Sequence, residues 1–321
     1  MKRKTILSIL VATFFCLALV GCNMTSEAQE KRLQIKIAEQ YGLAYAPLQI
    51  MKEKQLLEKS VPGIEVSWRQ LGNTAAIREA MLAGELDIGF MAIPPFLIGW
   101  DKGMDWKIAC GLSSSPIGLV VNKDTIQSIR DFTKEDRIAL PQPGSIQHIL
   151  LSMACEKEWG DPKRLDNQLI TLDHPDGMSA LLARSEVSAH FTTPPYLFKE
   201  LDEPGIHQIL DGQAVMGEEF TFAVGVTTGK FYKEQPEVYE AFLKALEEAL
   251  NFMEDNPTET VSILARAYQM DREELLNYLE RSDTTFSIEV QGVMKFADFM
   301  QKYSYINRKP THLEEVLWDR Q

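Results

Sequence analysis

Short apolar strands and amphipathic helices alternate along most of this chain, and this alternation constrains the fold more than any other feature. The first series places strand patterns at 34–38, 64–69 and 86–90 around helix patterns at 47–58 and 74–83. A second series has helix patterns at 128–132, 145–159 and 176–183 and strand patterns at 137–140, 168–172 and 187–191. Such alternation predicts an α/β protein in which helices cover central sheets.

The remaining segments predict further strands and a helical end. Residues 108–111 and 118–121 form strand patterns, and a strand at 221–227 is expected to pair with 118–122. Residues 236–254 and 291–303 repeat apolar side chains at helical spacing and predict core-facing helices.

Length and composition predict two lobes. The chain has 321 residues, of which 45% are apolar, which is enough for two cores. No Pro/Gly/Ser-rich linker separates them, so ordered strands should join the lobes. We predict a tether at 22–32, a first lobe built from 33–120 and 221–321 with its C-terminal helices, and a second lobe at 121–220.

The N-terminus determines the expected location. Lys2, Arg3 and Lys4 precede an apolar stretch at 5–20, which is typical of a signal peptide at 1–21. A transmembrane anchor is the alternative, but about 16 apolar residues are marginal for a span of about 20. Residues 19–22 resemble the lipobox of a bacterial lipoprotein signal. This resemblance implies cleavage before Cys22, lipidation of its thiol and an extracytoplasmic protein anchored to the cell membrane by lipid.

The charge balance disfavours some partners. Loss of Lys2, Arg3 and Lys4 with the signal peptide changes the formal net charge from -13 to -16. Such an acidic surface disfavours nucleic acid and offers no basic patch to anionic lipid headgroups, so membrane attachment should depend on the acyl chains.

The reactive side chains predict neither a metal centre nor an enzyme. Cys16 leaves with the signal peptide and Cys22 is lipidated, so Cys110 and Cys155 remain and form either one disulfide or two buried thiols. The five His residues show no metal-binding spacing, and we expect no cofactor. The chain has no GxSxG, P-loop or GxGxxG motif, and the serines at 113–115 have no assigned base, so they are expected to lie in a polar loop.

Five segments together resemble substrate-binding lipoproteins of ABC importers: 35–59, 80–96, 118–132, 143–151 and 306–318. The group includes proteins that bind aliphatic sulfonates, taurine, nitrate and thiamine-pyrimidine precursors. The resemblance implies a type II periplasmic-binding-protein fold, in which two lobes close about a hinge on a small-molecule ligand. It also implies a monomer that delivers its ligand to an ABC permease with its ATPase.

An enzyme or an extracellular ligand sensor on the same fold is the alternative function. Thiamine-pyrimidine synthases that share the fold are characterised by a cysteine-rich segment, and this chain has none. It also lacks a second transmembrane pattern and a signalling domain. Both absences favour the binding protein.

Candidate ligand-binding residues lie where strands turn into helices, because ligands of α/β sheets gather at the carboxyl ends of the strands. After the first strand, Gln40 offers an amide, Tyr41 a ring and hydroxyl, and Gly42 permits a tight turn or a close approach of the ligand. At Gly144 and Ser145 a helix begins, with Ser145 as its N-cap, and the adjoining backbone donors of Ile146, Gln147 and His148 can hold an anion. An ordinary loop and a plain capped helix are the alternatives for these two corners.

The other two corners are similar to each other. Residues 80–98 and 180–198 align at an offset of 100 residues and share a Pro-Pro pair, after which a helix should begin near the second proline. Wall candidates at these corners are Ile93, Pro94, Phe96, Thr192, Thr193 and Tyr196. Between them, His174 is a further candidate, whereas Asp176 is expected to cap a helix.

Two ligand classes remain open at this point. The helix start at Ser145 favours an oxyanion such as a sulfonate, taurine or nitrate. Aromatic side chains near the corners favour a planar heterocycle such as a pyrimidine: Tyr41, Tyr45, Phe96, Trp100 and Tyr196.

Overall fold

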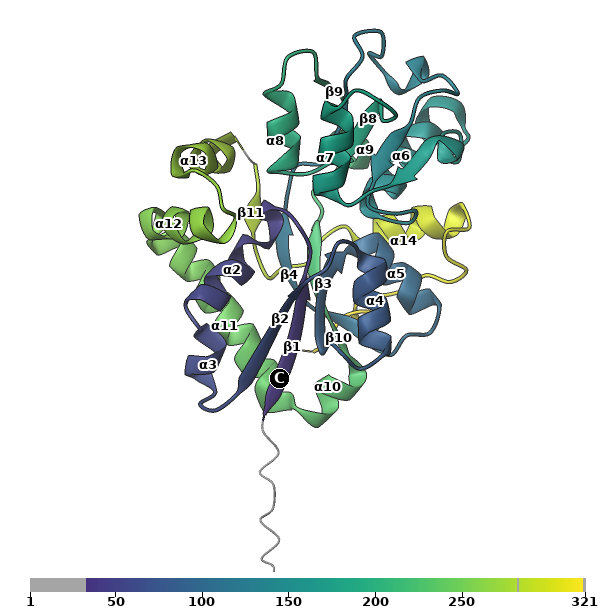
Figure 1. Cartoon of the computed structure of the whole chain (residues 1–321). Coiled ribbons are helices and arrows are strands. Elements are labelled where there is room, and N and C mark those ends of the chain that lie inside the picture. The colour runs from purple at the N-terminus through teal and green to yellow at the C-terminus, as the bar shows by residue number, and fades with distance from the viewer. Residues whose placement is uncertain (1–32, 282, 320–321) are drawn as a thin grey trace, which may run out of the picture. The chain divides into compact units, whose positions relative to one another are not determined.

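Two β-sheets covered by helices organise the chain (Figure 1). The structure, a computed structural model, describes residues 33–281 and 283–319. The predicted signal peptide, the lipidation site Cys22 and the predicted tether lie outside the described residues. Both sheets combine parallel strands with connecting helices, so the predicted α/β class is confirmed.

The six-stranded sheet has the strand order β11-β4-β10-β3-β1-β2. Its strands are β1 (Gln34–Glu39), β2 (Glu65–Gln70), β3 (Ile88–Ala92), β4 (Trp106–Ser114), β10 (Ala223–Thr228) and β11 (Thr285–Phe286). β1 pairs in parallel with β2 and β3, whereas β10 runs antiparallel between β3 and β4. Every residue of β3 is buried, as expected for a strand covered on both faces.

The five-stranded sheet has the order β7-β6-β8-β5-β9 and repeats part of this plan. Its strands are β5 (Gly118–Val121), β6 (Ile138–Leu140), β7 (Leu169–Thr171), β8 (Ala189–Thr192) and β9 (His207–Asp211). β6 pairs in parallel with β7 and β8, and β5 runs antiparallel between β8 and β9. The expected pairing of 221–227 with 118–122 is therefore wrong, because β10 and β5 belong to different sheets.

The chain passes between the sheets twice. It leaves the six-stranded sheet after β4 and returns to it at β10, so β5 to β9 form one continuous insertion. The lobe boundaries at 120/121 and 220/221 stay a prediction.

Helices flank both sheets. They are α2 (Ala46–Glu53), α3 (Leu56–Ser60), α4 (Thr74–Leu82), α5 (Ile93–Asp101), α6 (Ile146–Trp159), α7 (His174–Leu182), α8 (Tyr196–Leu201), α9 (Gly212–Met216), α10 (Gly229–Glu234), α11 (Pro236–Asp255), α12 (Pro257–Ala267), α13 (Arg272–Arg281) and α14 (Val293–Lys302). Four 3-10 turns complete the described chain: η1 (Leu43–Tyr45), η2 (Ile129–Asp131), η3 (Asp166–Gln168) and η4 (Leu313–Glu315). The long helix α11 buries Val238, Phe242, Leu246 and Ala249 on the predicted apolar side. Full burial of a Val, Leu or Phe side chain contributes roughly 1.5–3 kcal/mol.

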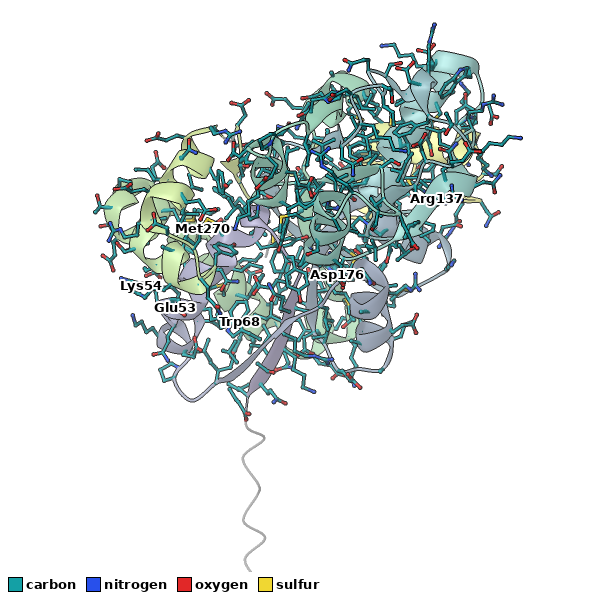
Figure 2. The ribbon with its side chains drawn as sticks, turned by 45° about the horizontal axis from the view of Figure 1, so that its top comes forward. Glu53, Lys54, Trp68, Arg137, Asp176 and Met270 are labelled. Carbon is teal, nitrogen blue, oxygen red and sulfur yellow. The ribbon has the colours of Figure 1, made fainter. Side chains whose placement is uncertain are left out.

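Several predicted element boundaries are wrong for local reasons. The single helix expected at 47–58 is two helices, because Gln55 has a left-handed backbone with φ of 52°. Next to it, Lys54 forms an ion pair with Glu259 of α12 over 2.9 Å (Lys54 is labelled in Figure 2). Ser113 and Ser114 belong to β4 rather than to a loop.

Helix starts differ from the predictions as well. α7 begins at His174, so Asp176 (labelled in Figure 2) lies in its first turn and is not its cap. Pro175 suits that first turn because its missing N–H has no role there. α8 begins after its Pro-Pro pair as predicted, whereas α5 already begins at Ile93, before its pair. The predicted helix start near the second proline is therefore wrong for α5.

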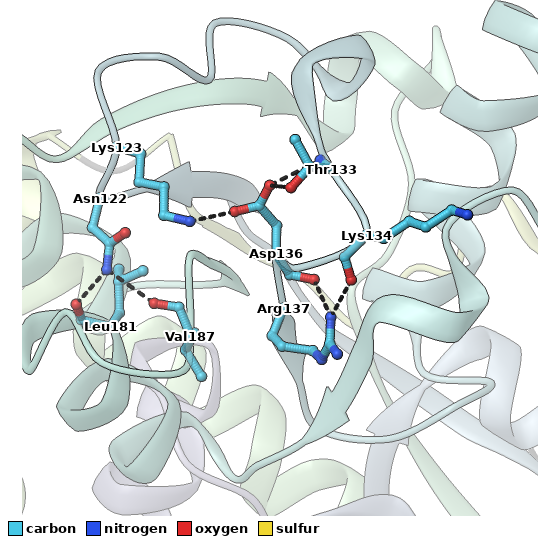
Figure 3. Close-up of polar contacts among 8 residues, drawn as sticks. All are labelled: Asn122, Lys123, Thr133, Lys134, Asp136, Arg137, Leu181 and Val187. Carbon is cyan, nitrogen blue, oxygen red and sulfur yellow. Dashed lines mark hydrogen bonds and ion pairs between the residues drawn. The ribbon is translucent and has the colours of Figure 1, made fainter.

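Polar contacts fix the chain where it leaves β5 (Figure 3). The Asn122 amide donates to the carbonyl oxygens of Leu181 at 2.8 Å and Val187 at 3.0 Å. Asp136 accepts from Lys123 and from the backbone N–H and hydroxyl of Thr133. Burial raises the pKa of Asp136, but these hydrogen bonds outweigh it and lower the pKa to about 2.

Cys110 and Cys155 are both buried and are not joined by a disulfide. Of the two possibilities left open by the sequence, the structure thus shows two thiols, one in β4 and one in α6. Within residues 33–281 and 283–319, no helix is both long and apolar enough to cross a membrane.

Candidate functional site

A cavity lies between the two sheets, where α4, α5, α6 and α7 begin. Thirteen residues line it: Gln40, Tyr41, Tyr45, Thr74, Ala92, Pro95, Pro141, Gln142, Ser145, Ile146, Gln147, His174 and Phe222. The space with its mouth amounts to about 380 Å³, but the centre of a water-sized sphere can move through only about 20 Å³. The cavity as it stands therefore holds about one water molecule. A larger ligand requires the corners around it to move apart.

Five of the predicted ligand-binding residues line this cavity: Gln40, Tyr41, Ser145, Gln147 and His174. The other nine lie beside or behind it: Gly42, Ile93, Pro94, Phe96, Gly144, His148, Thr192, Thr193 and Tyr196. A ligand-binding role remains a prediction for all fourteen.

Gln40 links the first corner to its neighbours. Its amide nitrogen donates to the Thr74 hydroxyl at 3.2 Å and to the Phe90 carbonyl at 3.1 Å. Phe90 belongs to β3, and Thr74 opens α4, so one side chain ties together the carboxyl ends of two strands and a helix start. This orders the first-lobe side of the cavity.

The start of α6 forms the opposite side. The Ser145 hydroxyl accepts from the backbone N–H of His148 at 3.3 Å, which makes Ser145 the N-cap as predicted. The backbone N–H groups of Ile146 and Gln147 have no acceptor within the helix, because the first turn lies before the hydrogen-bond ladder starts. They lie at the positive end of a 14-residue helix, where an anion binds favourably.

His148 is occupied by structural hydrogen bonds. Its Nδ1 accepts from the Gly144 backbone N–H at 2.8 Å, so its proton resides on Nε2, which donates to Asp166 Oδ1 at 3.1 Å. Its ring also meets Tyr305 edge-on. Neither ring nitrogen of His148 is left for a ligand.

The corner at Gly42 approaches the other lobe. Leu43 N–H donates to the Pro194 carbonyl at 3.0 Å, and a Cβ on Gly42 would lie only 3.2 Å from that same oxygen. With φ of 128°, Gly42 also has a backbone that other residues rarely adopt. Gly42 thus approaches Pro194 closely, whereas a close approach of a ligand to Gly42 stays a prediction.

Most wall candidates from the two Pro-Pro corners are buried behind the cavity. Phe96 is fully buried and packs on Trp106 with ring centroids 5.8 Å apart. Tyr196 stacks on the His174 ring at 5.8 Å, and the Thr192 hydroxyl lies 3.1 Å from His174 Nδ1. Tyr196 and Thr192 thus support His174, which itself lines the cavity.

Six lining residues were not named as possible ligand contacts from the sequence: Thr74, Ala92, Pro95, Pro141, Gln142 and Phe222. Thr74 follows β2 at a helix start, so the strand-end rule that selected the other corners also applies to it. Phe222 precedes β10, which is antiparallel, and Ala223 pairs with Ala92 at the end of β3. The rule considers only residues that follow the carboxyl end of a strand. Phe222 precedes the amino end of β10, so the rule misses it.

The cavity is electrically neutral apart from the helix dipoles. Its lining contains no Lys, Arg, Asp or Glu. The nearest buried carboxyl on the first lobe is that of Glu39, which accepts from the Gln49 amide. Burial raises the pKa of Glu39 to about 7. The pKa of Tyr45 is raised by burial and by the nearby Glu39 carboxylate.

The chain belongs to the NMT1-like family, whose model matches residues 28–267. A putative aliphatic sulfonates-binding protein of Bacillus subtilis is 26% identical over 96% of this chain and 92% of its own length. The taurine-binding periplasmic protein of Escherichia coli is 25% identical over 72% of each chain.

A solved structure shows the same fold. The alkanesulfonate-binding protein SsuA from Xanthomonas axonopodis pv. citri, bound to MOPS, superposes with a TM-score of 0.74 at 18% identity and covers 89% of this chain and 98% of its own. The predicted type II periplasmic-binding-protein fold is therefore confirmed.

Proposed function

We propose that this protein is the lipid-anchored, extracytoplasmic binding protein of an ABC importer, which captures a small organic sulfonate and delivers it to the permease. One observation carries the choice of ligand class. Four helices, α4, α5, α6 and α7, begin at a cavity whose lining contains no charged Lys, Arg, Asp or Glu side chain. Their positive ends favour an anion that spreads its charge over several oxygens.

The organic part of the ligand would contact the aromatic lining. Tyr45 meets Phe222 edge-on with centroids 6.5 Å apart, and Tyr41 lies in the same lining. This leaves an apolar surface beside the helix starts, as an alkanesulfonate requires. The names of the Bacillus and Escherichia relatives support the same ligand class.

A planar heterocycle is supported less well. Of the five aromatic residues that favoured it, only Tyr41 and Tyr45 line the cavity. Phe96 packs on Trp106, Tyr196 stacks behind His174, and Arg308 covers the ring of Trp100 at 4.3 Å. These five side chains therefore do not provide two parallel aromatic rings between which a planar ligand could stack.

A binding protein rather than an enzyme or a sensor is supported by the relatives, which are named for binding. Lipid attachment through Cys22, the monomeric state and the ABC permease with its ATPase as partners are part of the same proposal. Their support is the resemblance of residues 19–22 to a lipobox and of the chain to the importer receptors.

Sulfonates should stabilise the purified protein against heat. At a concentration about a hundredfold above Kd, a simple alkanesulfonate or taurine is expected to raise Tm by roughly 5 °C, because it binds the folded state alone. Differential scanning fluorimetry measures this shift. Alkylammonium salts and sulfate at equal ionic strength are the controls. A shift from pyrimidines with none from sulfonates would contradict the proposed ligand class.

A further inference from the structure

A buried line of polar side chains runs from the cavity into the second lobe. Gln147 Nε2 lies 3.3 Å from His174 Nε2, and His174 Nδ1 lies 3.3 Å from His190 Nε2. His190 Nδ1 lies 2.6 Å from Glu200 Oε1. All four side chains are nine-tenths buried or more, and only Gln147 and His174 line the cavity. His190 and Glu200 have no place in the ligand site described above.

The packing fixes this line. α7 and β8 supply the two rings, and a Cβ on Gly177 of α7 would lie 2.6 Å from His190 Nε2. Tyr196 stacks on the other ring, and the Thr192 hydroxyl, which can donate or accept, faces His174 Nδ1. The two rings can therefore exchange donor and acceptor roles by a shift of protons, while their heavy atoms stay in place.

Both rings are neutral, and each carries one proton. Burial lowers the pKa of His190 to about 3, and burial together with His190 lowers the pKa of His174 well below its ordinary value. In a neutral imidazole one nitrogen donates and the other accepts. Consequently, when the two rings hydrogen-bond to each other rather than His174 to Thr192, the proton position at one end of the line sets the positions along it.

With an ionised Glu200, every hydrogen bond points toward the carboxylate. His190 Nδ1–H donates to Glu200, His174 Nδ1–H donates to His190, and the Gln147 amide N–H donates to His174. Gln147 is then left with its carbonyl oxygen and its second amide N–H, and the oxygen lies on the side away from His174. The structure has the amide nitrogen toward His174, which is the orientation of the ionised state, and the protonated state requires the amide to turn over.

With a protonated Glu200, every hydrogen bond points the other way. The carboxyl O–H donates to His190 Nδ1, His190 Nε2–H donates to His174 Nδ1, and His174 Nε2–H donates to Gln147. A half-turn of the Gln147 amide then places its oxygen against His174 and turns its N–H groups to the cavity. Reversal releases one proton from Glu200 to solvent and shifts one proton across each ring, so each ring stays neutral.

The surroundings of Glu200 favour the protonated form at neutral pH. The side chain is fully buried, and within the described residues Oε2 has no hydrogen-bond partner. An ionised carboxylate with an unsatisfied oxygen in the interior is costly. Burial accordingly raises the pKa of Glu200 to about 9.

We infer that Gln147, His174, His190 and Glu200 form a proton-ordered relay in which Glu200 decides whether Gln147 offers donors or an acceptor to the ligand. A protonated Glu200 presents N–H groups, which suit an anion made only of acceptor oxygens. An ionised Glu200 presents a carbonyl oxygen, which repels it. The relay rests on the proposed function for its ligand class, and it explains how a cavity without Lys or Arg in its lining can select a sulfonate. His190 and Glu200 are positioning residues.

Other ionisable groups around Glu200 are few. Of the two elements that pack most closely on α8, α7 contributes His174 and Asp176, and β5 contributes no ionisable side chain. β8 contributes His190. Lys199 of α8 forms an ion pair with Glu274 of α13, and Asp202, just after α8, forms one with Arg281. The pKa of Tyr196 is raised to about 12 by burial and by Tyr41. Glu39 is the other buried carboxyl close to the cavity, and it titrates near pH 7.

The test follows alkanesulfonate affinity against pH, because the charge of that ligand does not change in the range used. Isothermal titration between about pH 7.5 and pH 10 should show about a tenfold rise in Kd for the wild type, as one donor to a charged ligand becomes an acceptor. Glu200→Gln cannot ionise and can donate to His190, so its Kd should stay level over that range. Glu39→Gln is the matched control and should keep the rise near pH 9.

A ligand-free readout separates the relay from the proposed function. Nitrogen-15 NMR of the His174 and His190 rings should show both tautomers switching near pH 9 in the wild type and staying fixed in Glu200→Gln. If no sulfonate binds but the tautomers switch, the ligand class fails and the relay stands. The relay would be overturned if the His174 and His190 tautomers of the wild type did not change with pH. It would also be overturned if Kd of Glu200→Gln rose with pH as much as that of the wild type.

Discussion

Replacement of Glu200 by glutamine should raise the free energy of unfolding by about 3 kcal/mol at pH 7. The pKa of this carboxyl rises from 4.5 to about 9 on folding because the side chain is buried. At pH 7 the folded protein holds the proton and the unfolded chain has released it, so the fold bears a cost that a neutral amide of the same shape lacks. Urea unfolding of both proteins measures the difference.

The pH dependence gives this gain a distinctive sign. A raised carboxyl pKa lowers wild-type stability as pH rises from about 4.5 to about 9, so the advantage of Glu200→Gln should grow across that window and vanish below it. Glu203→Gln, exposed just beyond α8, is the control and should change stability by less than about 0.5 kcal/mol. A glutamine variant no more stable than the wild type at pH 7 would contradict a protonated Glu200.

Replacement of Gly72 by valine should weaken ligand binding roughly tenfold to a hundredfold. A Cβ at Gly72 would lie 1.8 Å from Oδ2 and 2.4 Å from Cγ of Asp173, the residue before the cavity-lining His174. Asp173 also accepts from the Asn73 amide at 3.3 Å. A side chain at this point would hold the two corners apart and oppose closure over the ligand. Isothermal titration with an alkanesulfonate measures the loss.

A second substitution distinguishes a steric block of lobe closure from misfolding. Asp173→Gly removes the carboxylate that the valine would strike, so the double variant should regain most of the affinity lost by Gly72→Val. The melting temperature without ligand should differ little among the three variants, since the contact joins partly exposed loops. Wild-type affinity in the single valine variant would show that closure does not need this approach.

Local chemistry made part of this structure predictable. The start of α6 follows from Ser145 and the long helix pattern after it, and Gln40 and Tyr41 follow from their place after a strand. In both cases the residues adjacent in the sequence were enough to make the prediction. The break at Gln55 was missed, and so was the start at Val293 of the helix predicted at 291–303. The left-handed backbones of Gln55 and Gly292 interrupt a helix without changing the apolar spacing.

Contacts between distant segments were not predictable in this way. His174, His190 and Glu200 meet because α7, β8 and α8 pack together, and no spacing in the chain encodes that line. The similar corners illustrate the same limit. They occupy equivalent places, after β3 and after β8, each beside an antiparallel strand. Yet Pro95 lines the cavity, whereas Pro194 receives a hydrogen bond from Leu43.

The small size of the cavity has a kinetic consequence. A space of about 20 Å³ for a water-sized sphere is too small for a sulfonate, so a ligand of that size can enter or leave only when the corners move apart. Departure then waits for the lobes to separate, and the residence time reports the strength of contacts such as Leu43 with Pro194 and Asn73 with Asp173. Substitutions in those contacts would tune how long cargo is carried without altering which cargo is chosen.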